Sequence, residues 1–247
     1  MKNVDLWRAT KYEQTETGYR GSRDKLHLAI PSRLLADLTV AAYSKYLPQY
    51  AKGKLADLGC GRVPLYDIYK DHVEEVVCID WGNSIHAKTH LDFECNLNSD
   101  LPLQANSIDT VLLSDVLEHI ANPEAFLGHV VKCLKPEGVL MLNVPFAYWL
   151  HEEPFDYFRY TQHGLEYLLA KNGFKIKKII TLGSVIEIIV DLLGKFILKN
   201  SFLQSIAVYS GQRTNALLRR SSRGEVYLDA ISSKMPMGYF VIAIKSV

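Results

Sequence analysis

Two acidic residues, Asp57 and Asp80, stand at the ends of short apolar runs, and Asp57 leads directly into Gly59 and Gly61. Glycines after a strand let the chain turn sharply toward a helix and let a ligand approach the backbone closely. A carboxylate at the end of the next strand can accept hydrogen bonds from two adjacent ribose hydroxyls. The spacing therefore predicts a binding site for a ligand that contains a ribose.

The third glycine of the dinucleotide-binding fingerprint is absent from this turn. Gly-x-Gly-x-x-Gly would require glycine at position 64, where it lets the helix start close to a pyrophosphate, and the chain has Pro64 there. A ribose-containing ligand without phosphates fits this pattern better than a nicotinamide dinucleotide does.

A second group of reactive side chains lies in the aromatic segment 144–161. It contains His151, Asp156 and Arg159. A histidine that is neutral near pH 7 can take a proton from a hydroxyl group. Asp156 could orient this histidine, and Arg159 could bind an anionic acceptor group or pair with Asp156. In the alternative interpretation, Asp156 and Arg159 form a salt bridge that only shapes the loop. Polar groups among aromatic rings suit a polyhydroxylated acceptor.

Composition excludes several other classes of protein. The 247 residues carry a net charge of +1, so no bulk attraction to nucleic acid is expected, and no Asn/Asp-Pro-Pro-Tyr/Phe motif for base methylation is present. The four cysteines include no Cys-x-x-Cys pair, which argues against zinc and redox sites and suits a reducing cytoplasm. His86 and His90 have no obvious third ligand, so no metal site is predicted. The first residues contain no apolar signal segment.

The elements that must position these residues alternate along the chain. We expect strands near 54–58, 75–80, 109–114 and 138–144, with helical segments between them, including 63–70 and one that begins at Asn122. A helix from Arg33 to about Tyr46 precedes them, with Ser32 as its cap and Pro48 as its end. Such alternation predicts an α/β fold with a parallel sheet covered on both faces. Lys135-Pro-Glu-Gly138 is expected to turn into the last of these strands.

The C-terminal third departs from this alternation. A strand is expected over 175–181, and 238–245 reads as its antiparallel partner. The apolar segment between them reads as a helical insertion. Its polar residues recur every four positions and predict one polar stripe on an apolar helix, which suits a packed lid, a dimer contact or a helix on a membrane surface. These residues are Glu187, Asp191, Lys195 and Lys199.

Five motifs in order resemble those of the class I S-adenosylmethionine-dependent methyltransferases, with the closest match to the type 11, small-molecule branch. The motifs are Asp57-Leu-Gly-Cys-Gly61, Cys78-Ile-Asp80, Leu101-Pro-Leu through Ser107-Ile-Asp109, Thr110 through Ile120, and Leu134-Lys-Pro-Glu-Gly138. The resemblance implies a Rossmann-like, mostly parallel seven-stranded sheet with helices on both faces, an antiparallel C-terminal strand, and a helical insertion before that strand. It implies one domain, with an N-terminal helical cap (1–50), a cofactor-binding core (51–182), an insertion or lid (183–233) and a final strand (234–247).

The resemblance also implies roles for particular residues around S-adenosylmethionine. The turn 59–61, including Cys60, would make backbone contacts above Asp57, and Asp80 would hold the ribose. Trp81 could stack on the adenine, with Asn96 and Leu97 near its amino group. Ser114 and Asp115 would lie beneath the methionine portion. Among N-terminal residues, Tyr19, Arg20 and Arg23 could close over the cofactor carboxylate. His119 is expected to be a hydrogen-bonded structural residue more than a base.

The pattern His-x-x-Pro-x-Asp-x-x-Arg-x-Thr from His151 to Thr161 resembles a bacterial subgroup that modifies cell-surface sugars. The sequence therefore predicts a cytoplasmic methyltransferase that acts on a small molecule or sugar, mainly by O-methylation. The alternatives are a cofactor-binding subunit without catalysis and, less favoured, an NAD-dependent oxidoreductase. Homodimer formation and peripheral membrane contact through the insertion are further expectations.

Overall fold

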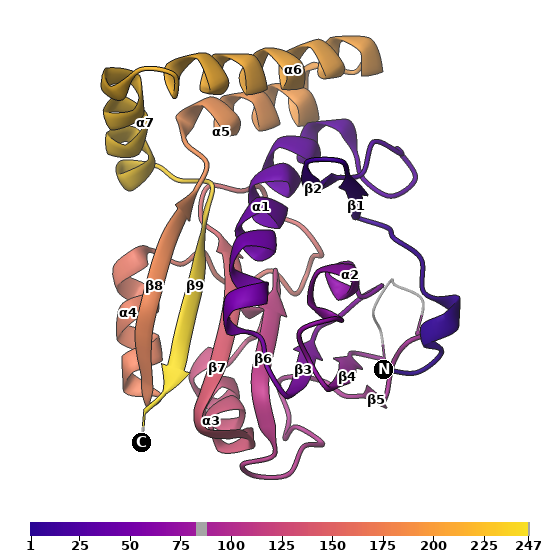
Figure 1. The fold of residues 1–247 in the computed structure, drawn as a ribbon. Helices are drawn as coiled ribbons and strands as arrows, with labels where there is room; N and C mark the ends of the chain where they lie inside the picture. The colour runs from indigo at the N-terminus through magenta and orange to yellow at the C-terminus, as the bar shows by residue number, and fades with distance from the viewer. Residues whose placement is uncertain (83–87, 247) are drawn as a thin grey trace.

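The apolar runs predicted as strands form one seven-stranded sheet in the computed structural model, which describes residues 1–82 and 88–246 (Figure 1). The strand order is β5-β4-β3-β6-β7-β9-β8. The strands are β3 (Lys54–Leu58), β4 (Glu75–Asp80), β5 (Phe93–Glu94), β6 (Ile108–Ser114), β7 (Leu134–Pro145), β8 (Phe174–Leu182) and β9 (Gly238–Lys245).

Only β9 runs against its neighbours in this sheet. It pairs antiparallel with both β7 and β8, whereas the pairings among β5, β4, β3, β6 and β7 are all parallel. The predicted fold class is therefore confirmed. The strand order reverses at β3, which lies between β4 and β6, and such a switch point is where α/β sheets bind ligands, at the carboxyl ends of the strands.

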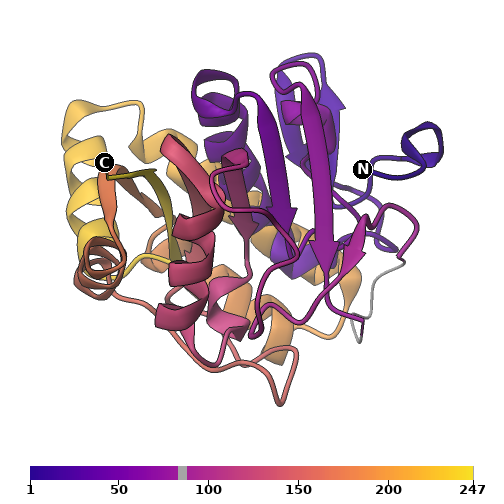
Figure 2. The ribbon, with the colours of Figure 1, turned by 90° about the horizontal axis from the view of Figure 1, so that it is seen from below.

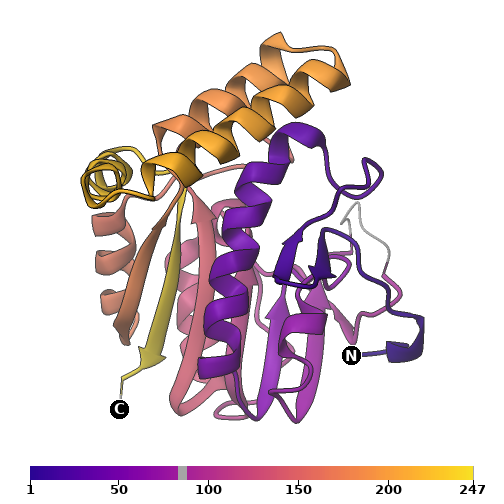
Figure 3. The ribbon, with the colours of Figure 1, turned by 45° about the horizontal axis from the view of Figure 1, so that its top comes forward.

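Helices cover both faces of the sheet, and each face has its own apolar core. On one face α1 (Arg33–Tyr50) and α2 (Tyr66–Tyr69) pack through Val40, Tyr43 and Ile68. On the other face α3 (Pro123–Cys133) and α4 (Gln162–Lys171) pack through residues such as Phe126 and Leu165. Figure 2 and Figure 3 show α1 on one side of the strands and α3 and α4 on the other. Successive side chains of each strand point alternately into the two cores, as a sheet covered on both faces requires.

Several predicted helix ends differ from those observed. Asn122 caps α3 by accepting a hydrogen bond from the Ala125 amide, as predicted. Ser32 makes no side-chain cap, and Pro48 does not end α1, which continues to Tyr50. A proline this close to a carboxyl terminus removes only a hydrogen bond of the last turn. The predicted helix 63–70 shrinks to the four residues of α2, because Val63 adopts a positive φ of 53°.

Two regions form strands where the sequence predicted none. β7 starts immediately after α3, and the expected turn 135–138 is instead an irregular stretch of this strand, where its register with β6 shifts. The N-terminal segment, which reads as polar and irregular, forms a hairpin of β1 (Tyr12–Thr15) and β2 (Gly18–Gly21). Short helical turns η1 (Val4–Leu6), η2 (Ile30–Ser32) and η3 (Leu117–His119) complete this part of the chain.

The insertion between β8 and β9 consists of α5 (Val185–Leu192), the π-helical turn η4 (Leu193–Ile197), α6 (Ser201–Leu218) and α7 (Ser222–Lys234). The helices α5 and α6 lie against each other at the end of the sheet where β8 finishes (Figure 1, Figure 3).

Three of the four residues of the predicted polar stripe, Glu187, Asp191 and Lys195, face inward, whereas Lys199 is exposed. Glu187 is buried and contacts Asn215 of α6, and the buried Asp191 pairs with Lys195 at 2.7 Å. Large apolar side chains are exposed instead, including Ile189 and Phe196. These charged side chains therefore hold the helices of the insertion together, because buried charges are stable only when they are paired. Contact with a membrane surface or a second chain through this segment stays a prediction.

None of the helices in the described ranges is both long enough and apolar enough to cross a bilayer.

Candidate functional site

The ends of β3 and β4 bring the glycine turn and Asp80 together. Gly59 and Gly61 both have positive φ, at 70° and 53°. The Gly61 amide donates to Asp80 Oδ2 at 2.9 Å, and the Trp81 amide donates to Asp80 Oδ1 at 2.7 Å. The carboxylate is thus oriented by two backbone N–H groups, and its remaining lone pairs are open to further donors.

Gly59 is required by the sharp turn, as predicted, and also by packing. A Cβ at this position would lie 2.5 Å from Cγ2 of Val116, a side chain that the sequence pattern did not indicate as a neighbour. The positive φ alone would already disfavour any other residue. Packing and backbone conformation together therefore fix the glycine.

Asp57 lies beneath this turn and is buried. Its Oδ2 accepts a hydrogen bond of 3.1 Å from the hydroxyl of Tyr69 in α2, which ties β3 to the helix that follows it. Burial raises the pKa of Asp57 to about 7, although the tyrosine hydroxyl opposes the shift. Cys60 is also buried, and the adjacent Cys78 thiol together with burial raises the pKa of Cys60, so the thiol stays neutral.

The three residues expected around the adenine make three different kinds of contact within the protein. The Trp81 ring packs edge-on against Phe155 of the aromatic segment, with ring centres 4.7 Å apart. Leu97 is buried in the apolar core. The Asn96 side-chain oxygen already accepts from the Asn98 amide at 3.0 Å, so this oxygen is engaged in a local turn. His86 lies outside the described residues, and His90 Nδ1 lies 3.2 Å from the backbone oxygen of Lys2.

Ser114 and Asp115 lie at the end of β6, next to β7. Asn143 joins them, because its side-chain oxygen accepts from Ser114 at 3.0 Å and its amide nitrogen donates to Asp115. Lys11 Nζ forms an ion pair of 3.0 Å with Asp115 Oδ2. Asp115 itself has a positive φ of 55°.

The N-terminal residues expected at this edge are engaged elsewhere. Tyr19 donates to Asp67, Arg20 pairs with Glu13, and Arg23 pairs with Asp37. Lys11 lies at the site in their place, because the β1–β2 hairpin begins directly after it.

Arg159 holds the aromatic loop together through hydrogen bonds from every nitrogen of its guanidinium group. It holds both oxygens of Asp156, at 2.6 and 2.7 Å, and its remaining N–H groups donate to the backbone oxygens of Tyr148, Trp149 and Phe158. These contacts use all five donors of an arginine side chain. Although burial opposes the shift, Arg159 and the His151 backbone amide lower the pKa of Asp156 to about 2. The geometry thus favours the loop-shaping interpretation over binding of an anionic acceptor.

His151 meets two residues of η3, Glu118 and His119. Its Nε2 lies 3.9 Å from Glu118 Oε1, and the two imidazole rings are 4.8 Å apart. Burial and the neighbouring His119 ring lower the pKa of His151, although Asp156 opposes the shift. Burial and the nearby Asp115 carboxylate raise the pKa of Glu118 well above its usual range.

A cavity of about 150 Å³ joins these groups at the carboxyl end of the sheet. Its lining includes Lys11, Asp115, Glu118, His119, Tyr148 and His151.

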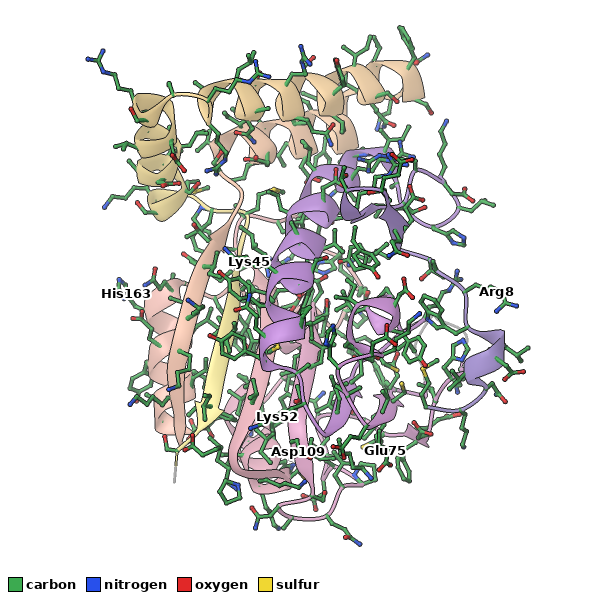
Figure 4. All side chains as sticks on the ribbon, viewed as in Figure 1. Arg8, Lys45, Lys52, Glu75, Asp109 and His163 are labelled. Carbon is green, nitrogen blue, oxygen red and sulfur yellow. The ribbon has the colours of Figure 1, made fainter. Side chains whose placement is uncertain are left out.

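A larger cavity of about 590 Å³ lies at the opposite end of the sheet, beside the first residues of β3 and β4. Glu75 borders it, and Figure 4 shows Glu75 with Lys52 and Asp109 at the end of the sheet away from the insertion. Ligands of parallel sheets bind at the carboxyl ends of the strands, and this cavity contains none of the predicted site residues. We therefore take the smaller cavity as the site.

Sequence reasoning missed Glu118 and Lys11 as members of the site. The spacing Asp115-x-x-Glu118-His119 after a strand end was a usable signal, because it sets three ionisable groups within five residues of a ligand-binding edge. No local signal identified Lys11, which reaches Asp115 across 104 positions of the chain.

Comparisons with known proteins agree with this geometry. A family model described as a methyltransferase domain matches residues 30–178, more than half of the chain. A ubiquinone biosynthesis O-methyltransferase of Coxiella burnetii is 25% identical over 182 residues, which cover 68% of this chain and 71% of that protein.

Solved structures share the fold at lower sequence identity. A putative S-adenosylmethionine-dependent methyltransferase from Listeria monocytogenes has a TM-score of 0.56 at 18% identity, covering 87% of this chain and 99% of that one. The [4+2]-cyclase SpnF has a TM-score of 0.55 at 17% identity, covering 86% and 84%. The second likeness is to a cyclase, so the fold by itself does not select methyl transfer.

Proposed function

This chain belongs to the methyltransferase domain family and is an S-adenosylmethionine-dependent methyltransferase, and we propose that it transfers the methyl group to a hydroxyl oxygen of a small-molecule or sugar acceptor. The printed name of the Coxiella burnetii relative, an O-methyltransferase, supports oxygen as the acceptor atom. The single observation that carries the proposal is the small cavity, where a neutral histidine, His151, and the ring of Tyr148 meet beside the end of β6.

The cofactor would lie across the carboxyl ends of β3, β4 and β6. Asp80 would accept from the ribose hydroxyls with the lone pairs that Gly61 and Trp81 leave open, while the backbone of 59–61 lines the nucleoside. Trp81 would contact the adenine from its place beside Phe155. Ser114 and Asp115 would adjoin the methionine portion, with Lys11 close to its carboxylate.

The acceptor would enter the cavity between Tyr148 and His151. The sulfonium makes its methyl carbon electrophilic, so the protein must mainly align the acceptor oxygen opposite the sulfur, and alignment can supply about 7–11 kcal/mol. The acceptor O–H gives its proton to His151 Nε2, the oxygen bonds to the methyl carbon, and the C–S bond breaks with its electron pair on sulfur. Asp156 and Arg159 position His151, since Asp156 holds the His151 amide at 2.9 Å.

Calorimetric titration tests the cofactor half of the proposal. We expect binding of S-adenosylmethionine and S-adenosylhomocysteine and none of NAD(H). Asp80→Ala should abolish that binding, whereas the matched control Asp100→Ala, whose side chain is 96% exposed, should not. Retention of cofactor affinity in Asp80→Ala would remove this carboxylate from the site.

A methyl-transfer assay over a panel of hydroxyl, amine and sugar acceptors tests the other half. We expect transfer to a hydroxyl compound, and we expect His151→Asn to bind the cofactor normally but to lose at least ~100-fold in turnover. Cofactor binding with no transfer to any acceptor would favour a non-catalytic subunit, and transfer only to amines would overturn the oxygen assignment.

A further inference from the structure

Glu118 is a fully buried carboxylate without a partner. Its side chain is 0% exposed, and neither carboxylate oxygen has a hydrogen-bond partner within the ranges that the structure describes. Buried charged groups in proteins are paired with another charge or coordinate a metal ion. An orphaned carboxyl group is therefore either held neutral by burial or completed by a bound cation.

Two imidazoles turn their unprotonated nitrogens toward this carboxylate. His119 Nδ1 lies 3.0 Å from the backbone oxygen of Phe155. His151 Nδ1 lies 3.3 Å from the backbone oxygen of Trp149 and 3.2 Å from Asp156 Oδ2. Because these oxygens only accept hydrogen bonds, Nδ1 carries the proton in both rings and Nε2 keeps its lone pair.

The three electron-rich groups face one another. The Nε2 atoms of His119 and His151 each lie 3.9 Å from Glu118 Oε1. No described N–H group stands between the three atoms in these tautomers, so the space that they enclose is open to a cation. We propose that Glu118, His119 and His151 form a binding site for a divalent transition-metal ion, of which Zn²⁺ is the best match.

The spacing suits direct coordination. The three ligand atoms all lie within 4.8 Å of one another. Two atoms bonded to one ion at about 2.0–2.1 Å are at most about 4.2 Å apart, so small side-chain rotations close the site. Hydrogen bonds from Nδ1 to a backbone oxygen or carboxylate are also the outer contacts that orient metal-binding histidines.

The donor set selects the class of metal. Two imidazoles and one carboxylate bind catalytic zinc in other enzymes, whereas Mg²⁺ and Ca²⁺ prefer oxygen ligands. Three protein ligands also leave a coordination position open, and the cavity that contains Tyr148 and Asp115 adjoins all three. Such an open position is typical of a catalytic site more than of a structural one.

The consequence for catalysis rests on the proposed function. An acceptor hydroxyl bound at the open position ionises more easily, because a bound cation lowers the pKa of a coordinated oxygen. The proton passes to water, the alkoxide oxygen bonds to the methyl carbon, and the C–S electron pair stays on sulfur. His151 then acts as a ligand in place of a base.

Metal binding by the full chain tests the site without any acceptor. The purified protein is stripped with a chelator, titrated with Zn²⁺, and separately loaded with Co²⁺ for its visible spectrum. We expect one Zn²⁺ per chain and intense Co²⁺ bands of a four- or five-coordinate nitrogen–oxygen site. Saturation by Mg²⁺ but not by Zn²⁺ would overturn the choice of metal, and binding of neither would overturn the site.

Variants locate the ion. Glu118→Gln and His119→Asn should each weaken Zn²⁺ binding by at least ~100-fold, since loss of an outer-shell contact alone costs about 10–100-fold. The matched control is His163→Asn, because His163 lies 3.1 Å from Glu166 on the exposed surface of α4 and lacks a third ligand in the described chain. Circular dichroism checks that each variant folds. Unchanged Zn²⁺ affinity in folded Glu118→Gln would refute the site.

The two proposals fail in different ways. Methyl transfer that survives complete chelation but falls in His151→Asn would keep the O-methyltransferase with a histidine base and refute the catalytic role of the ion, while the Zn²⁺ titration decides whether the site binds metal. Stoichiometric Zn²⁺ that depends on Glu118, with no transfer to any hydroxyl, would keep the metal site and refute the acceptor assignment.

Discussion

Asp156 and Glu118 both have buried carboxyl groups on the acceptor side of the site, but only Asp156 has hydrogen-bond partners for its carboxylate among the described residues. Asp156 is 1% exposed and accepts from both terminal nitrogens of Arg159 and from the His151 amide. The side chain of Glu118 is 0% exposed, and its carboxylate accepts from no described residue. The first is an internal part of the loop. The second has only a space beside it in which two imidazole nitrogens converge.

This contrast separates residues that support an active site from residues that bind its ligand. A supporting polar group is fully satisfied by the chain itself, and removal of its partner is costly. A group reserved for a ligand is left unsatisfied, and the fold as a whole compensates for that cost. Asp57 lies between the extremes, because it is buried with a single partner, the Tyr69 hydroxyl.

Loss of the satisfied carboxylate should have the largest effect on stability. Asp156→Ala leaves Arg159 half-buried and unpaired, and we expect the free energy of unfolding to fall by about 3–4 kcal/mol in urea. The folded-state pKa of about 2 lies below the ordinary 3.8, so this stabilisation is present above pH 3.8 and is lost as the pH falls toward 2. Removal of the exposed Glu166 should change little. If Asp156→Ala were as stable as the parent protein, the Asp156–Arg159 pair would not be a stabilising support of the loop.

The carboxylate with one partner should give an intermediate effect of opposite pH dependence. The folded pKa of Asp57 is raised to about 7 from 3.8, so folding holds its proton more tightly, and stability falls as the pH rises through 7. From pH 5 to pH 8 this contribution should decrease by about 2–3 kcal/mol. Urea unfolding of Asp57→Asn at both pH values should lack that decrease. An equal slope in both proteins would show that Asp57 is ionised throughout.

The unsatisfied carboxylate should show the smallest change, with the reverse sign. In metal-free protein Glu118→Gln replaces a buried carboxyl group that has no partner with an amide that can donate to His119 and His151 Nε2. We expect the free energy of unfolding to rise by about 1–2 kcal/mol, seen as a higher Tm. A lower Tm would mean that Glu118 already has a stabilising partner.

The sheet could be predicted because each strand carries its own signal. Leu55, Ala56 and Leu58 form a run that only a doubly covered strand can bury, and Gly59 with Asp80 marks the ends that meet. Parallel neighbours then follow from the alternation with helices. The meeting of Gly61 and Asp80 at this edge was predictable for the same reason, since strand ends are set by local pattern, and their role in cofactor binding stays a prediction.

The helical insertion illustrates where local pattern gives the wrong face. Charges at a spacing of four in 187–199 predict one polar stripe, but Asp191 and Lys195 pair inside the molecule, whereas Lys199 is exposed. Lys195 also lies 3.9 Å above the Tyr148 ring of the acceptor loop. Which side of an amphipathic helix is inward depends on the partners that the fold supplies, and periodicity does not encode those partners.

Local sequence patterns set the order of strands and helices along the chain, the glycine turn and the acid at each strand end, because hydrophobic periodicity and turn chemistry act over a few residues. Long-range packing alone brings Lys11 to Asp115, engages all donors of Arg159 within the loop, and places His151 opposite Glu118. These contacts join residues far apart in the chain, and whether a buried charge is paired or left open is settled only when every neighbour is in place.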